Sequence, residues 1–163
     1  MKRTTFLSAL GAFALGLSLT ASARAIDDAT FFQGIRLGQT FKEIDAYYKP
    51  YASELGLMWH SGALPGEKDY DLRTASVPQR RIYFSIRASD KRVVSVLYWK
   101  LGDYQHPGQG QTFSETEVSR LTALNESSSG TKLYHKLTVE DDDAELTFCS
   151  EAEYVKQLRA GNR

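Results

Sequence analysis

The chemically active residues of this 163-residue sequence form no recognisable catalytic constellation. Cys149 is the only cysteine, and it stands directly before Ser150, where we expect a helix to begin. Backbone amides at a helix N-terminus favour a thiolate, so one hypothesis is a Cys-dependent hydrolase with His60 or His106 as its base. The residues around Cys149 form no catalytic motif, and a small, partly buried thiol is the competing interpretation.

Metal ligands are not grouped in the sequence either. The three histidines are His60, His106 and His135, and none of them has a second possible ligand at the spacing of a zinc site. A calcium loop beginning at Asp141 would need Gly at its sixth position and Glu at its twelfth, where Leu146 and Ala152 stand. We interpret the acidic residues 140–145 as a charged hairpin turn. Phosphate-binding glycine loops and nucleophile elbows are also missing, so we predict no metal, no cofactor and no enzymatic activity.

The first 25 residues have the three parts of a cleavable secretory signal peptide. Lys2 and Arg3 form the positive start, residues 6–19 carry no charge, and Ala23-Arg24-Ala25 places small residues at the cleavage positions. The apolar stretch is shorter than the roughly 20 residues that a membrane-spanning helix needs. We therefore expect cleavage near Ala25, release into the periplasm or the medium, and no integral membrane span afterwards.

Cleavage also changes the charge balance. The precursor carries 20 basic and 20 acidic residues, and three basic ones leave with the signal, so the mature chain has 17 against 20 and a net charge of −3. Nucleic-acid-binding domains are normally basic, so we predict no nucleic-acid partner. The remaining 163 − 25 = 138 residues, 26–163, suit a single domain. With one cysteine, its core forms without an internal disulfide.

Three segments carry the capping-box signature of a helix start, in which a hydroxyl and a glutamate cap each other's backbone amides. They are Thr40-Phe41-Lys42-Glu43, Ser114-Glu115-Thr116-Glu117 and Ser150-Glu151-Ala152-Glu153. Apolar residues at helical spacing follow each box, and Pro50 predicts that the first helix ends near Lys49.

Two hairpins are predicted between these helices. Residues 81–88 alternate between apolar and polar, and residues 92–101 return after a turn at 89–91. Residues 133–139 and 144–148 form the second pair. Residues 50–79 keep two interpretations, because 55–59 fits a short helix or a strand and 70–77 resembles a strand.

The returning strand of the first hairpin is apolar on both faces. Its two sets are Val94, Val96 and Tyr98 on one face, and Val93, Leu97 and Trp99 on the other. A two-residue turn would place the Trp99 set in the core beside Ile82, whereas a three-residue turn would place the Tyr98 set there. Bulky apolar groups are therefore expected on the second face in either register.

Two interpretations of that second face stay open. Residues 50–79 could cover it as a loop, since a central strand is commonly buried on both faces. Alternatively, it is a partner-binding face rich in Tyr, Trp and Arg, the types enriched in interface hot spots. On that hypothesis the candidate protein-binding residues are Arg81, Tyr83, Arg87, Tyr98 and Trp99.

A short internal repeat suggests two unequal halves. Gly38-Gln39-Thr40-Phe41 recurs as Gly110-Gln111-Thr112-Phe113, and each copy precedes a predicted helix that is followed by strands. The expected fold is therefore α+β, an antiparallel sheet with helices packed on one face, arranged as two helix–hairpin repeats over 26–104 and 105–163.

Residues 31–50 resemble the helix-entry motif of the β-lactamase-inhibitor-like fold, which includes secreted β-lactamase inhibitor proteins and small lipoproteins of outer-membrane assembly. The resemblance lies in Gly38-Gln39-Thr40 and the following Glu43-Ile44, with Gln39 where the family usually has Met. It implies helices on one face of an antiparallel sheet whose other face or loops hold a partner protein. The inhibitors' cysteines and the lipoproteins' anchoring cysteine are absent.

These observations favour a non-enzymatic exported protein that binds another protein of the cell envelope. An inhibitor or immunity protein against an envelope-acting enzyme is the most concrete form of the hypothesis. An accessory factor of envelope assembly is the second form, and a Cys-dependent or small-ligand-binding enzyme is the rival class.

Overall fold

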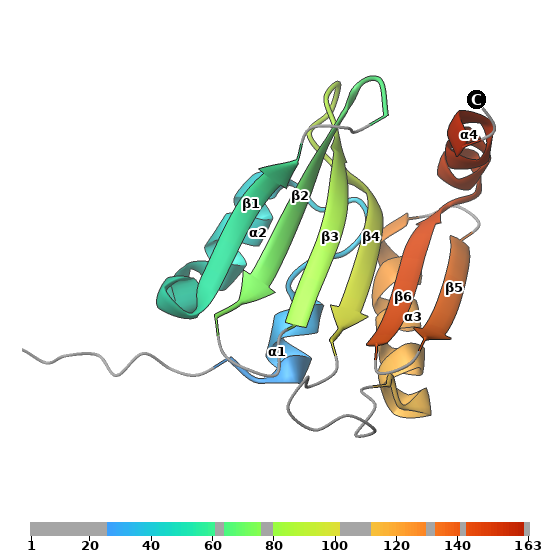
Figure 1. Cartoon of the computed structure of the whole chain (residues 1–163). Coiled ribbons are helices and arrows are strands. Elements are labelled where there is room, and N and C mark those ends of the chain that lie inside the picture. The colour runs from blue at the N-terminus through green and yellow to red at the C-terminus, as the bar shows by residue number, and fades with distance from the viewer. Residues whose placement is uncertain are drawn as a thin grey trace, which may run out of the picture.

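The computed structural model describes residues 26–60, 64–75, 80–101, 112–129, 133–140 and 143–161. Six antiparallel strands form one sheet in the order β1-β2-β3-β4-β6-β5, seen face-on in Figure 1. The strands are β1 Leu55–His60, β2 Glu67–Thr74, β3 Arg80–Arg87, β4 Val93–Lys100, β5 Leu133–Glu140 and β6 Asp143–Ser150. The predicted α+β class with an antiparallel sheet is confirmed, and strands from both halves of the chain share this sheet.

The helices divide unequally between the two faces. They are α1 Asp28–Gln33, α2 Phe41–Tyr48, α3 Glu115–Ser129 and α4 Glu151–Gly161, with a 3-10 helix η1 at Lys49–Glu54. The first three lie behind the sheet in Figure 1, as the sequence predicted. Helix α4 instead packs on the opposite face, where Tyr154 stacks on Tyr134 and Lys156 forms an ion pair with Glu67.

The capping signals explain where helices begin. Thr40 Oγ1 accepts a hydrogen bond from the Glu43 amide, and Glu43 Oε2 accepts one from the Thr40 amide. Ser114 and Glu117 repeat this reciprocal pair at the start of α3. Gly38 has a φ of +78°, a conformation that glycine adopts without the steric cost of a side chain.

The described parts of residues 50–79 do not form a covering loop. Strands β1 and β2 pair from Leu55↔Thr74 to His60↔Asp69, and β2 pairs with β3, so this hairpin extends the sheet sideways. Residues 55–59 are therefore strand rather than helix. The interpretation that this segment covers β4 as a loop is wrong, because its strands β1 and β2 pair beside β3 and widen the sheet.

A β-bulge sets the register of the β3–β4 hairpin. Ile82 pairs with Tyr98 and Phe84 with Val96, but the pairing shifts at Ser85/Ile86 so that Ile86 faces Val93. The Tyr98 set therefore joins the core, as in the longer-turn alternative. Val93 is also buried, because the bulge returns it to the covered side.

The core lies between the sheet and the three helices behind it. Phe31 and Phe32 of α1 are fully buried, and Phe32 packs edge-on against Tyr98 at a ring distance of 5.8 Å. Gly34 ends α1 close to α2, and a Cβ there would lie 2.3 Å from the Tyr48 ring. Close packing of aromatic rings therefore carries this fold without a disulfide.

Asn125 is the polar centre of this core and is fully buried. Its Nδ2 donates to the Tyr98 hydroxyl over 3.1 Å and to the Leu121 carbonyl over 2.8 Å, and its Oδ1 accepts from the Leu37 amide over 3.0 Å. The Tyr98 hydroxyl in turn donates to the Ile35 carbonyl over 2.6 Å. The Asn125 side-chain amide thus forms hydrogen bonds with α3, with β4 and with the turn before α2.

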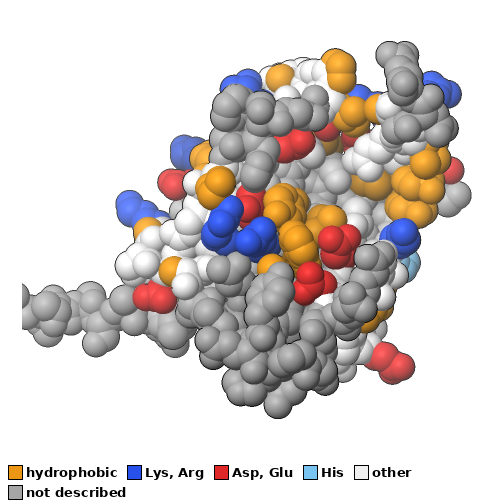
Figure 2. All heavy atoms as spheres, viewed as in Figure 1, with side chains coloured by type: hydrophobic (Ala, Val, Ile, Leu, Met, Phe, Trp, Pro, Cys, Tyr) orange, Lys and Arg blue, Asp and Glu red, His pale blue; other side chains and the backbone are white. Residues whose placement is uncertain are grey.

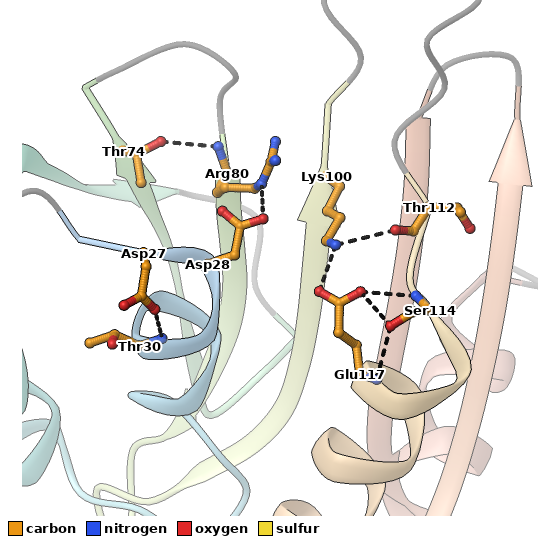
Figure 3. A network of polar contacts seen from close by, with 9 residues as sticks. All are labelled: Asp27, Asp28, Thr30, Thr74, Arg80, Lys100, Thr112, Ser114 and Glu117. Atoms are coloured by element: carbon orange, nitrogen blue, oxygen red, sulfur yellow. Dashed lines mark hydrogen bonds and ion pairs between the residues drawn. The ribbon is translucent and has the colours of Figure 1, made fainter.

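Two buried cationic side chains, Arg80 and Lys100, lie at one end of the core. Arg80 and Lys100 are paired across β3 and β4 and are both buried. Figure 3 shows that each meets an acidic residue from the first turn of a helix: Arg80 Nε lies 3.1 Å from Asp28, and Lys100 Nζ lies 2.7 Å from Glu117. Acidic residues near helix N-termini are favourable in themselves, so these ion pairs fix α1 and α3 to the sheet.

Removing the buried polar centre should destabilise the protein. Tyr98→Phe leaves the Ile35 carbonyl and one Asn125 donor without their partner, and we expect a loss of about 1–3 kcal/mol in the free energy of unfolding. Asn125→Ala should cost about 2–4 kcal/mol, and the double variant should cost less than the sum because both changes remove the same bond. Urea unfolding measures these values.

The half-buried Tyr51 on η1 provides the matched control. Tyr51→Phe should change the free energy of unfolding by less than about 0.5 kcal/mol. Equal effects of Tyr51→Phe and Tyr98→Phe would contradict the role given to the Asn125 centre.

Candidate functional site

The sheet face opposite α1, α2 and α3 carries the candidate site, and we call it the open face. Directly paired residues of antiparallel strands lie on the same face, so the register gives its rows. One row is Arg73, Arg81, Trp99 and Glu145, and the next is Met58, Asp71, Tyr83, Leu97 and Thr147. Figure 2 shows hydrophobic side chains in the middle of this face, with basic groups on one side and acidic groups on the other.

An arginine and two aromatic rings form the centre of the open face. The Arg81 guanidinium lies 5.4 Å from the centre of the Trp99 ring, within the range of a cation–π contact. The Tyr83 and Trp99 rings are 5.7 Å apart, and Arg81 Nη1 donates to the Tyr83 hydroxyl over 3.2 Å. These contacts hold three large side chains in fixed positions, each of them partly exposed.

The indole N–H of Trp99 lacks a hydrogen-bond partner among the described residues. Its Nε1 atom is buried. A buried donor without an acceptor costs free energy.

An ion pair adjoins the aromatic centre on β2. Asp71 is fully buried although it lies on the open face, and its Oδ2 is 2.8 Å from Arg73 Nη2. Arg73 pairs across the strands with Arg81. The Arg73 side chain lies toward β1, with Nη2 2.8 Å from Asp71 and 2.7 Å from Met58 Sδ, whereas Arg81 lies over Trp99.

The five predicted binding residues divide three ways. Arg81, Tyr83 and Trp99 lie together on the open face. Tyr98 belongs to the opposite face, where it is fully buried in the core, so its assignment to a binding surface is corrected. Arg87 lies six residues along β3 from Arg81, roughly 20 Å away, and pairs with Asp90 in the hairpin turn.

Cys149 does not present a reactive thiolate. Its side chain is 1% exposed, and burial, followed by the nearby Glu153 carboxylate, raises the pKa of the thiol to about 11. The helix N-terminus at α4 was expected to favour the thiolate, but loss of hydration outweighs it. At neutral pH the thiol is therefore protonated and enclosed.

Metal binding has no visible centre in the described residues. Within those ranges, no three His, Cys, Asp or Glu side chains are grouped so as to hold an ion. His106 and Asp141 lie outside the described residues. His135 stands on edge strand β5 with its ring 5.9 Å from the Phe148 ring, which is a packing contact.

Sequence reasoning missed the contribution of β2 to the site. Glu67, Asp69, Asp71 and Arg73 stand at every second position of β2, with Tyr70 and Leu72 between them, whereas Lys68 is a charged residue at a core-facing position. Such a period of two is the signature of a strand with one apolar face, and here the polar face belongs to the open face. That alternation was the available signal, and it would have added Asp71 and Arg73 to the candidates.

Comparisons with protein-family models, curated proteins and solved structures gave no match for this chain. The resemblance of residues 31–50 to the β-lactamase-inhibitor-like fold therefore stays a prediction. In the structure, residues 31–33 form the end of the short helix α1, and the Thr40 box begins α2.

The buried thiol makes a direct prediction. A raised pKa and an enclosed sulfur should make alkylation of Cys149 at pH 7.4 at least about a hundredfold slower in the folded than in the urea-unfolded protein. Because the pKa rises from 9.0 to about 11 on folding, stability should fall as the pH increases through this interval. Cys149→Ser should remove that part of the pH dependence, and rapid labelling of the folded protein would contradict the account.

Proposed function

We propose that this chain is a non-enzymatic, exported binding protein that holds a partner protein against the open face of its sheet. The observation that carries the proposal is the Arg81–Tyr83–Trp99 cluster on a sheet face that α1, α2 and α3 leave uncovered. Trp, Tyr and Arg are the residue types whose truncation most often weakens protein interfaces.

The rigidity of the cluster supports the proposal. The three side chains contact one another on adjacent strands, so they lose little conformational freedom when a partner covers them. An exposed aromatic centre beside charged residues also matches the apolar core and polar rim of protein interfaces. The structure holds these residues on strands, which position side chains more firmly than loops do.

The charged residues of the open face indicate which charges the partner's surface would carry. Arg73 and Arg81 form the basic side of the centre, and Glu145 of β6 lies beyond Trp99 in the same row. A matching surface would place carboxylates opposite the two arginines and an apolar or aromatic group over Trp99 and Leu97. An envelope-acting enzyme that this protein inhibits, or a toxin that it neutralises, is the partner class we favour.

Two other functions follow from the same chain. An accessory of envelope assembly would use the open face in the same way, so identification of the partner decides between it and an inhibitor. A Cys-dependent enzyme would need Cys149 accessible, and its burial weighs against that role. No helix among the described residues is long and apolar enough to cross a membrane.

Capture from an envelope extract tests the open face. With the purified protein as bait, one partner should be retained. Tyr83→Ala combined with Trp99→Ala should weaken its binding at least about thirtyfold, since one hot-spot truncation alone costs about 2 kcal/mol or more. Isothermal titration with the identified partner measures the change in Kd.

The control pair lies on the other side of the sheet. Leu57 and Leu137 are 47% and 42% exposed on the edge strands, on the face that the helices cover. Leu57→Ala combined with Leu137→Ala removes exposed apolar surface from that side and should leave the Kd within about twofold. A Kd that responds to this pair and ignores the Tyr83 and Trp99 variant would sink the assignment.

Export gives a separate prediction. When the full chain is produced in a cell with a Sec pathway, the protein recovered outside the cytoplasm should begin at Ile26, as intact-mass measurement would show. Ala25→Leu places a large residue at the cleavage position and should leave the precursor uncut. Recovery of the full 163 residues from the wild-type chain would refute export by a cleaved signal.

A further inference from the structure

A hollow lies in the open face beside the Arg81–Tyr83–Trp99 cluster. It encloses about 410 Å³ and is bounded by Tyr83, Leu97 and Thr147 from the sheet and Gln157 from α4. Its floor includes Ser85 and Ser95, and Asp69 of β2 forms one side. Trp99 and Arg81 do not line it, so the hollow is a separate feature of the same face.

Small residues and the bulge explain why the hollow exists. Ser85 and Ser95 are directly paired on β3 and β4, so the two smallest side chains of this face lie next to each other. The bulge follows at Ser85/Ile86, and bulges bend a strand and re-aim its side chains. The large Tyr83 and Leu97 in the neighbouring row and α4 on the other side form the walls.

Asp69 determines the electrostatics of the hollow. It is the one charged side chain among the lining residues, and its Oδ1 is buried without a hydrogen-bond partner among the described residues. The other polar groups there are hydroxyls and the Gln157 amide. Because Asp69 lines the hollow, its carboxylate would attract a ligand that brings a positive hydrogen-bond donor.

The neighbouring residues increase the negative potential. Glu67 lies two residues before Asp69 on the same face of β2, and Glu153 lies four residues before Gln157 on the same side of α4. Burial, followed by the Glu67 carboxylate, raises the pKa of Glu153. Lys156 forms an ion pair with Glu67, so one cation already neutralises part of this acidic cluster. Asp69 has no ion pair of this kind among the described residues.

We propose that this hollow is a binding site for an organic ammonium ion, with Asp69 as its counter-ion and Tyr83 and Leu97 against its carbon chain. An ammonium group donates three hydrogen bonds, which fits one carboxylate and the surrounding hydroxyls. A volume of about 410 Å³ is within the usual range for small-ligand sites. A free alkylamine and a lysine side chain of a partner share this chemistry.

This inference goes beyond the proposed function and does not require it. Titration of the purified protein with n-butylammonium chloride, followed by amide NMR shifts, should give saturable changes at Asp69, Ser85 and Ser95. Sodium butyrate and sodium chloride at the same ionic strength should not produce them. Nα-acetyl-lysine N-methylamide distinguishes the sources: tighter binding than n-butylammonium assigns the site to a lysine side chain, and weaker binding assigns it to a free amine.

Two variants locate the ligand. Asp69→Asn should weaken n-butylammonium binding at least about tenfold, since a charge-assisted bond is lost, whereas Asp45→Asn on the exposed side of α2 should not change it. Ser95→Leu fills the floor and should abolish binding, while Thr138→Leu on the same face of β5 should not. Shifts that match sodium chloride, or equal affinity in Asp69→Asn, would overturn the proposal.

Failure here and failure of the proposed function can be told apart. Trp99→Ala should weaken capture of the partner protein and leave n-butylammonium binding unchanged, because Trp99 does not line the hollow. Loss of ammonium binding alone, with partner capture intact, would remove the pocket assignment and leave the open face as the protein-binding surface.

Discussion

The pairing of β3 with β4, including the bulge at Ser85/Ile86, is the constraint on which the rest of this structure depends. A shift of one residue would exchange the two faces of both strands. In the observed register, Ile82, Phe84, Val96 and Tyr98 lie in the buried core, and Tyr98 reaches Asn125 and the Ile35 carbonyl. The same register leaves Arg81, Tyr83, Leu97 and Trp99 on the open face. Core and candidate site are therefore two consequences of one alignment, and the bulge adds the small-residue floor of the hollow.

The open face combines two kinds of chemistry in neighbouring rows. Its centre is aromatic and basic, with Arg81 over Trp99 and Arg73 beside it. Its hollow is acidic, with Asp69 on one side and the Glu67–Glu153 pair beyond it. A partner surface that offers both carboxylates and a cationic side chain would meet both. Helix α4 limits the face at one end, held there by the Tyr134–Tyr154 stack and the Lys156–Glu67 ion pair.

Local signals in the sequence were sufficient for much of this fold. The Thr40 and Ser114 boxes place α2 and α3, because a cap depends on residues within one turn. Alternation places both hairpins and puts Arg81, Tyr83 and Trp99 within one candidate set. The register of β4 was left between two alternatives, since both of its faces are apolar and a bulge leaves no local signature. Tyr98 was assigned to the site for that reason, and only its distant partner Asn125 reveals the core role. The alternation within β2 marks a strand with one polar face, but it does not say which strand β2 pairs with, so the place of Asp71 and Arg73 beside Tyr83 and Arg81 depends on a contact between segments.

The central claim is that the open face, and not the helix side, contacts a protein. A photo-crosslinking amino acid placed at Leu97, between Tyr83 and Thr147 in its row, tests this in the producing cell. The matched position is Leu137, which is exposed on the other side of the sheet. The account predicts a discrete adduct with one partner protein from position 97 and none from position 137. An adduct from position 137 alone, or the same adduct from both positions, would contradict it.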